Sequence, residues 1–201
     1  YGDFWEYDQA GNTWIPRSDF GGTPRYAAAG FTIGLKGYVA TGNDGTYCKD
    51  LWEYDQITNV WTSKANLGGL ARQGAVGFSI GSKGYIGTGY ASSYLNDFWE
   101  YNPSSNNWIQ KANVGGDPRY GAIGFSLGLK GYIGTGICFI GQNVNVENAY
   151  RKDFWEYDPN TDSWTQRDDY GGNVIGNASA FTIGPYGYVG LGKSQFGNNG
   201  P

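Results

Sequence analysis

The chain has 201 residues, a net charge of −4, an isoelectric point near 4.7, and neither histidine nor methionine. The acidic balance, with no basic stripe, argues against nucleic-acid binding, and no apolar run approaches the roughly 20 residues of a membrane-spanning helix. Without histidine there is no Ser-His-Asp triad or imidazole base, and no ligand spacing typical of a zinc, calcium or phosphate site occurs, so we expect no catalytic residues, metal or cofactor.

The first predicted strand, DFWEYD at residues 3–8, belongs to a repeat that runs through the whole chain. Its four copies begin at Asp3, Asp50, Asp97 and Asp153, so that successive copies are 47, 47 and 56 residues apart. A fixed period of roughly 40 to 50 residues indicates a repeat architecture, and near the upper end of that range a β-propeller. We therefore treat residues 1–201 as a single repeat domain.

Other residues recur at the same spacing as the DFWEYD strand. Tryptophans recur at Trp14, Trp61, Trp108 and Trp164, Gly-Gly pairs begin at Gly21, Gly68, Gly115 and Gly171, and Gly-Tyr pairs end at Tyr38, Tyr85, Tyr132 and Tyr188. Two repeat positions account for all eight tryptophans. No tryptophan is therefore singled out as a special binding aromatic.

Each unit is expected to contain four short strands. In the second unit these are residues 74–80, 84–89, 97–101 and 107–111, which are rich in aromatic and β-branched residues and are separated by Gly, Pro and Asn turns. Successive side chains of a strand point to opposite faces, so the strand DFWEY has aromatic residues on both of its faces. That pattern predicts a sheet that is packed between two neighbouring sheets.

The strand phase divides the chain into half a unit, three whole units and another half. Residues 1–17 supply the last two strands of one unit, whole units begin near Arg25, Arg72 and Arg119, and residues 176–192 supply the first two strands of another. Three arrangements follow from this division. The chain is a segment of a longer propeller, or the halves meet in a four-bladed ring, or halves from different chains combine.

The order of an arginine, an apolar strand, Gly-Tyr-apolar-Gly-X-Gly, a loop, an aromatic strand with Tyr-Asp-Pro and then Trp resembles the kelch repeat of β-propellers in all four units. One detail departs from the family: its usual Gly-Gly doublet is Gly-Thr-Gly here, as at residues 87–89. The resemblance implies an all-β propeller with four-stranded antiparallel blades, but not one function, because such propellers serve as enzymes, sugar binders and scaffolds. Copper oxidases of this class, such as galactose oxidase, use histidine ligands, so their site cannot be carried over; no distinct acid–base set matches the sialic-acid mutarotases.

A glutamate in the middle of each aromatic strand needs a partner if it is buried. An arginine follows three of these glutamates by 19 residues, which predicts the structural pairs Glu6–Arg25, Glu53–Arg72 and Glu100–Arg119. The alternative is a ring of acids and arginines that lines a sugar site. Because a residue present in every unit is more often structural, we favour the pairs. In the fourth unit Ile175 stands where the arginine should be.

The loop between the second and third strands is nine residues longer in the third unit, where it covers residues 137–152. An insertion on one propeller face commonly carries binding. The candidate contact residues in this loop are Phe139, Ile140, Gln142, Asn143, Asn145, Tyr150 and Arg151. The alternative is that Phe139 and Ile140 plug the neighbouring blade or cap the channel.

We expect a non-catalytic binding module, secreted or at the cell surface, that contacts a protein or a glycan through these loops. The alternatives are a structural subunit of an extracellular assembly joined through its half-blades, and a carbohydrate-active enzyme. The location rests on composition, with no Met or His and many Gly, Asn, Ser and Tyr residues. Cys48 and Cys138 are either two unpaired thiols or one disulfide.

Overall fold

The computed structural model describes residues 1–139 and 149–194, and this part of the chain folds into strands without any helix. An N-terminal hairpin joins β1 (Phe4–Asp8) to β2 (Thr13–Arg17). The first four-stranded sheet follows, with β3 (Ala29–Ile33), β4 (Lys36–Ala40), β5 (Leu51–Asp55) and β6 (Val60–Lys64). The second contains β7 (Val76–Ile80), β8 (Lys83–Gly87), β9 (Phe98–Asn102) and β10 (Asn107–Lys111).

The third four-stranded sheet contains β12 (Ile123–Leu127), β13 (Lys130–Gly134), β16 (Phe154–Asp158) and β17 (Ser163–Arg167). A second hairpin joins β18 (Ser179–Ile183) to β19 (Tyr186–Gly190). A small sheet beside the third unit is formed by β11 (Arg119–Tyr120), β14 (Ile137–Cys138) and β15 (Ala149–Tyr150). The predicted division into half a unit, three whole units and half a unit is therefore confirmed as three four-stranded antiparallel sheets between two hairpins.

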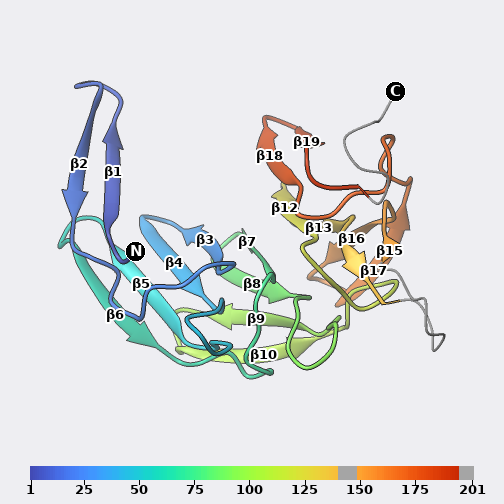
Figure 1. Cartoon of the computed structure of the whole chain (residues 1–201), viewed down its shortest axis with the longest axis horizontal. Coiled ribbons are helices and arrows are strands. Elements are labelled where there is room, and N and C mark those ends of the chain that lie inside the picture. The colour runs from blue at the N-terminus through green and yellow to red at the C-terminus, as the bar shows by residue number, and fades with distance from the viewer. Residues whose placement is uncertain (140–148, 195–201) are drawn as a thin grey trace.

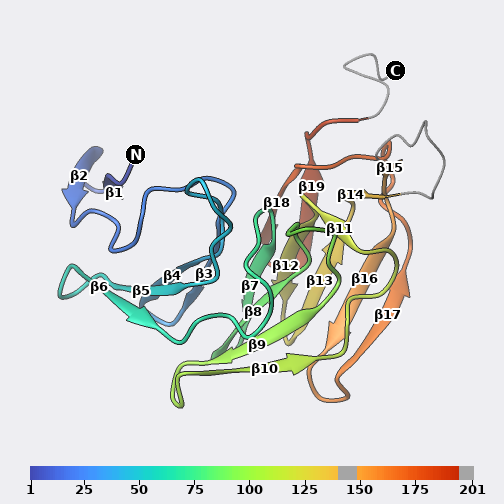
Figure 2. The ribbon, with the colours of Figure 1, turned by 60° about the horizontal axis from the view of Figure 1, so that its bottom comes forward.

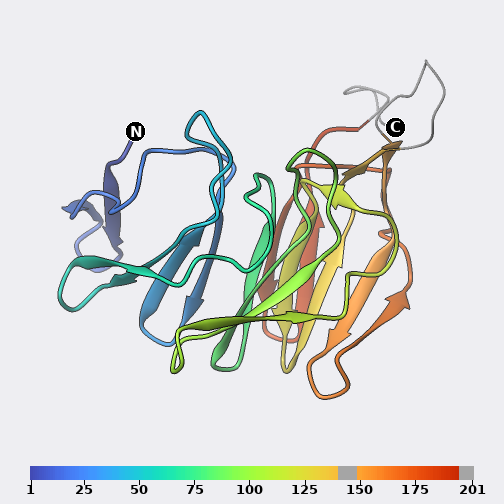
Figure 3. The same cartoon turned by 90° about the horizontal axis from the view of Figure 1, so that it is seen from below.

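The sheets follow one another along an open arc (Figure 1). Within each four-stranded sheet the strands are adjacent in chain order, and the first strands line the inside of the arc, where β3 lies against β7, β7 against β12 and β12 against β18. The hairpins β1–β2 and β18–β19 lie at the two separate ends of the arc (Figures 1 and 2). The loops that follow β4 and β8 lie on one side of the molecule, and the β3–β4 and β7–β8 turns lie on the other (Figure 3).

The core lies between consecutive sheets and consists largely of aromatic rings. On β9, Phe98 packs edge-on against Tyr157 of the third sheet, with ring centroids 4.9 Å apart. Tyr101 of the same strand instead packs against Tyr38 of the first sheet, with centroids 5.8 Å apart. Both faces of the aromatic strand β9 are thus buried, as its sequence predicts, and the second sheet is held by the first and the third.

The predicted Glu–Arg pairs are wrong, because each arginine pairs with the aspartate that begins the next aromatic strand. The ion pairs are Arg25–Asp50, Arg72–Asp97 and Arg119–Asp153, at 2.5 to 2.6 Å. Aspartate and glutamate are three residues apart on that strand, so their side chains leave it on opposite faces and only the aspartate meets the arginine.

The glutamates have other partners within their own sheets. Glu53 lies opposite Tyr38 in the β4–β5 ladder and accepts a 2.6 Å hydrogen bond from its hydroxyl. Tyr85 and Tyr132 donate in the same way to Glu100 and Glu156, at 2.9 Å. On the neighbouring strand a basic residue completes each site, in the pairs Arg17–Glu6, Lys64–Glu53, Lys111–Glu100 and Arg167–Glu156. Register within the sheet, rather than spacing along the chain, decides these contacts.

The Thr-Gly segment at the end of each second strand, preceded by Ala40 in the first unit and by glycine in the next two, supports the arginine. Thr88 is fully buried with a φ of 60°, a left-handed conformation that is uncommon for a β-branched residue. Its carbonyl oxygen accepts a 3.0 Å hydrogen bond from Arg72, and Thr41 and Thr135 serve Arg25 and Arg119 in the same way. The arginine and aspartate therefore hold the backbone in this turn.

Candidate binding surface on the loop face

The loops between the second and third strands are built on the same frame in all three whole units. Isolated bridges or short strands close them at equivalent pairs: Asn43 with Tyr47, Tyr90 with Tyr94, and Ile137 with Tyr150. The additional residues of the third loop therefore lie between Cys138 and Ala149. Of the predicted contact residues, Ile140, Gln142, Asn143 and Asn145 lie outside the described residues, whereas Phe139, Tyr150 and Arg151 lie within them.

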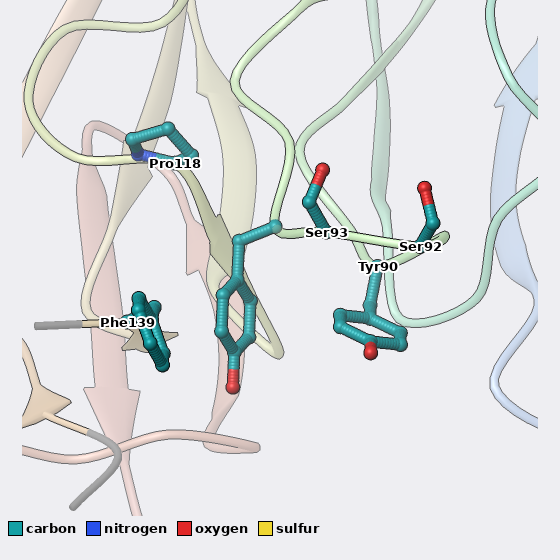
Figure 4. Close-up of a pocket in the computed structure, with 6 residues that line it drawn as sticks. Tyr90, Ser92, Ser93, Pro118 and Phe139 are labelled. Carbon is teal, nitrogen blue, oxygen red and sulfur yellow. The ribbon is translucent and has the colours of Figure 1, made fainter. Parts of the chain in front are cut away.

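A pocket of about 510 Å³ opens on this face between the second and third units. Its lining residues are Tyr90, Ser92, Ser93, Tyr94, Pro118 and Phe139. In Figure 4, Phe139 and Pro118 lie on one side of the pocket and Tyr90 and Ser92 on the other. Phe139 is 60% exposed and presents its apolar ring on this face beside the tyrosines of the preceding unit.

The pocket continues into a line of aromatic rings across the loop face. Tyr47 and Tyr90 pack edge-on with centroids 6.0 Å apart, and Tyr90 packs on Tyr94 at 5.3 Å. Tyr94 in turn lies 6.0 Å from Tyr120. Burial raises the pKa of the Tyr94 hydroxyl above its ordinary value. The surface therefore offers flat ring faces and phenol hydroxyl groups, which suit stacking and hydrogen bonding.

Two of the predicted contact residues support the pocket and do not line it. Arg151 donates hydrogen bonds of 2.5 and 2.9 Å to Asp117, the residue before Pro118, and thus fixes the wall of the pocket. Tyr150 is half-buried and pairs with Ile137 across β14 and β15. Phe139 is the predicted residue that the described structure places directly in the wall.

Sequence reasoning did not find Tyr90, Ser92, Ser93, Tyr94 or Pro118. One signal was available: Tyr90 occupies the repeat position that holds Asn43 in the first unit and Ile137 in the third. A position whose residue type differs between units does not need one particular side chain for the fold, so its side chain is free to serve binding. The residues of the short YASSY loop could have been singled out on that ground.

Both cysteines are free thiols, so the disulfide alternative is wrong. Cys138 is buried in β14, and Cys48 is half-buried in the loop of the first unit. Burial is the main cause of a raised pKa at each thiol, which leaves both protonated and weakly nucleophilic. Among the described residues, no cluster of carboxylates and thiols could hold a metal ion, and no helix is long and apolar enough to cross a membrane.

The fold and this surface define an all-β repeat protein with an aromatic pocket on its loop face. No family model and no curated protein matches the sequence. Among solved structures the chain is similar to YjhT, with a TM-score of 0.72 and 18% sequence identity over 85% of this chain. The match covers 58% of YjhT, so this chain spans less than two thirds of that protein's length. At this identity the likeness concerns the fold alone.

Proposed function

We propose that the chain is a kelch-type β-propeller, or a segment of one, and acts as a non-catalytic binding module for a protein or a glycan. The in-phase repeat motifs, the four-stranded antiparallel sheets along an arc and the likeness to YjhT support the architecture. Composition supports a secreted or cell-surface location. The observation that carries the function is the exposed aromatic pocket of Tyr90, Tyr94 and Phe139.

Aromatic rings supply a large contact area with few rotatable bonds, and Tyr adds a hydroxyl that can orient a polar ligand. The side chains of Ser92 and Ser93 add two further hydroxyl groups to the pocket. The described residues that line the pocket include no carboxylate, amine or thiol, which favours binding over acid–base or nucleophilic catalysis. The surface suits the apolar face of a sugar ring or an aromatic or proline side chain of a partner protein.

The test is binding of the labelled protein to an oligosaccharide array and to a phage-displayed peptide library. Phe139→Ala and Tyr90→Ala should each weaken binding to the selected ligands by tenfold or more, about 1.4 kcal/mol. Leu129→Ala is the matched control, because Leu129 is a similarly exposed apolar residue in a turn between β12 and β13. The proposal fails if neither probe yields a ligand, or if the control variant weakens binding as much as the pocket variants do.

A further inference from the structure

The third four-stranded sheet has an aromatic groove on the face toward β18–β19. The rings of Phe125, Tyr132 and Phe154 stack there with centroids 5.6 to 5.8 Å apart. The groove has a volume of about 450 Å³ and also contacts Asp168 and Tyr188. Within the described part of the chain nothing fills this groove.

In the second sheet the equivalent groove is filled by the hairpin β16–β17. The ring of Phe98 lies 4.9 Å from Tyr157 and 5.0 Å from Trp164. Trp164 Nε1 donates a 2.9 Å hydrogen bond to the Ala112 carbonyl oxygen, and the Ala112 N–H donates one of 3.0 Å to Asp162 Oδ1. A tyrosine, a tryptophan and a short polar turn residue thus form the seated hairpin.

The same seat recurs at the other junctions between sheets. Hydrogen bonds equivalent to those at Ala112 join Trp108 and Asn106 to Ala65, and Trp61 and Asn59 to Ser18. By the repeat, the next backbone position in this series is Asp168, which lies in the unfilled groove. The groove therefore presents the backbone groups that a seated tryptophan and turn residue would use.

The hairpin β1–β2 carries this set of residues on an exposed face. Tyr7 and Trp14 lie 5.2 Å apart, close to the 5.0 Å between Tyr157 and Trp164, and the Tyr7 hydroxyl donates a 2.8 Å hydrogen bond to Asn12. Yet Tyr7 and Trp14 are 48% and 63% exposed. The hairpin is already arranged for a groove that it does not occupy in this structure.

The strand edges also match. Among the described strands, β1 pairs only with β2, and β19 pairs only with β18. In the third sheet Tyr132 lies opposite Glu156 and donates its hydroxyl hydrogen to it. The same register would place Tyr188 opposite Glu6 and join β19 to β1 in a four-stranded sheet.

A vacant space at Gly171 completes the match. In the preceding units the indole of the aromatic strand lies on a glycine of the Gly-Gly pair: Trp52 on Gly21, Trp99 on Gly68 and Trp155 on Gly115. A Cβ built at Gly171 meets no atom within 4 Å. Trp5, the corresponding indole of β1–β2, is 47% exposed. The seat for this ring exists and is empty.

From this complementarity we infer that the groove beside β18–β19 binds the β1–β2 hairpin of a second copy of this chain. The contact is heterologous, with a hairpin on one copy and a groove on the next, so it generates a ring or a head-to-tail chain of copies. The two elements lie at opposite ends of the arc, which leaves both available to other copies (Figure 1). This inference uses no residue of the loop-face pocket.

One contact in the seat is missing. The arginine that holds the first aspartate of each aromatic strand is replaced by Ile175, which would leave Asp3 of the docked hairpin without its ion pair. The association is therefore weaker than the junctions within one chain and depends on concentration. An arginine at this position should strengthen it.

The first test is sedimentation equilibrium of the whole chain over a wide concentration range. We expect the average mass to rise above 21.9 kDa with concentration. Gly171→Leu should block the groove and Trp14→Ala should remove the anchor of the hairpin, and each should weaken association at least tenfold. Circular dichroism of each variant at low concentration checks that the monomer is folded. A mass that stays at one copy throughout overturns the proposal and favours closure of the hairpin onto its own chain, or no docking.

Mixing the two variants gives the sharper test. Gly171→Leu keeps its hairpin and Trp14→Ala keeps its groove, so the mixture should form a complex of two copies that grows no further. Ile175→Arg should strengthen self-association, and Asp3→Asn in the same chain should cancel the gain. A mixture that remains monomeric, or an Ile175→Arg gain that persists without Asp3, contradicts the proposed contact.

Discussion

At the scale of single residues, the arginine–aspartate pair is the contact on which each junction depends. Arg72 is fully buried and donates to both carboxylate oxygens of Asp97, and also to the carbonyl oxygens of Leu70 and Thr88. Burial pushes the pKa of Asp97 upward, but the hydrogen bonds from Arg72 outweigh this effect and hold it below the usual value. The pair joins a loop, the end of one strand and the start of the next.

Replacing Arg72 with leucine should destabilise the protein by about 3–5 kcal/mol, because it leaves the largely buried Asp97 without its partner. Urea denaturation followed by tryptophan fluorescence measures the loss. Arg17→Leu is the matched control, since Arg17 makes a similar two-bonded contact with Glu6 at a half-buried site that is more open to solvent than Arg72–Asp97, and it should change the midpoint less. Equal effects of the two substitutions would show that the buried pair contributes no more to the free energy of unfolding than the more exposed pair does.

Buried tyrosines make stability sensitive to alkali. Burial, reinforced by the hydrogen bond to Glu156, raises the pKa of Tyr132 to about 12, and burial raises that of Tyr101 to about 12. A group whose pKa is raised in the folded state stabilises fully below its unfolded pKa, near 10 for tyrosine, and this stability is lost as the pH rises toward 12. The melting temperature should therefore fall steeply as the pH rises above about 10.

Tyr132→Phe should flatten this alkaline fall, because it removes one of the tyrosines that ionise on unfolding. Tyr186→Phe, at an exposed position of β19, is the control and should leave the slope of melting temperature against pH unchanged. Absorbance of tyrosinate, recorded in the same titration, tells whether ionisation and unfolding coincide. Ionisation of all the tyrosines before any loss of structure would contradict the argument.

At the scale of elements, the sequence predicts the strands well and their contacts poorly. The strand predicted at 107–111 is β10, and the one predicted at 97–101 differs from β9 by one residue at each end. The alternation of apolar and polar residues and the turn residues between strands are local signals, so they can be interpreted without knowledge of the fold. The Glu–Arg pairs failed because a spacing of 19 residues does not say which face of a strand meets the next sheet.

The Gly-Gly pair is another element that depends on a contact between sheets. A Cβ at Gly115 would meet the indole of Trp155 at less than a normal contact distance, whereas one at Gly171 meets no atom within 4 Å. Gly115→Ala should therefore cost about 1–3 kcal/mol through overpacking, and Gly171→Ala should leave the stability of the monomer nearly unchanged. Chemical denaturation at low protein concentration compares the two. An equal loss in both would mean that the backbone, and not the indole, requires glycine.

At the scale of the whole molecule, the candidate pocket shows that a sequence repeat does not reveal contacts between the loops of neighbouring units. The long third loop identified Phe139, but Tyr90 and Tyr94 come from the preceding unit and Pro118 from the connection between the two. The period says which residues are equivalent, but not which loops of neighbouring units meet. That information resides in the packing of one sheet on the next and appears only once the arc is built.

The same stepwise packing predicts a gradient of stability along the chain. In a stacked array each unit gains stability from its neighbours, so an element packed on both faces opens less often than one packed on a single face. The sheet β7–β10 has neighbours on both sides, whereas Trp5, Tyr7 and Trp14 of β1–β2 remain about half exposed. Hydrogen exchange at low concentration should therefore show strong protection at β8 and β9 and weak protection at β1 and β2. Raising the concentration should protect β1 and β19 together if the hairpin docks on a second copy. Uniform protection along the chain at every concentration would contradict both the gradient and the docking.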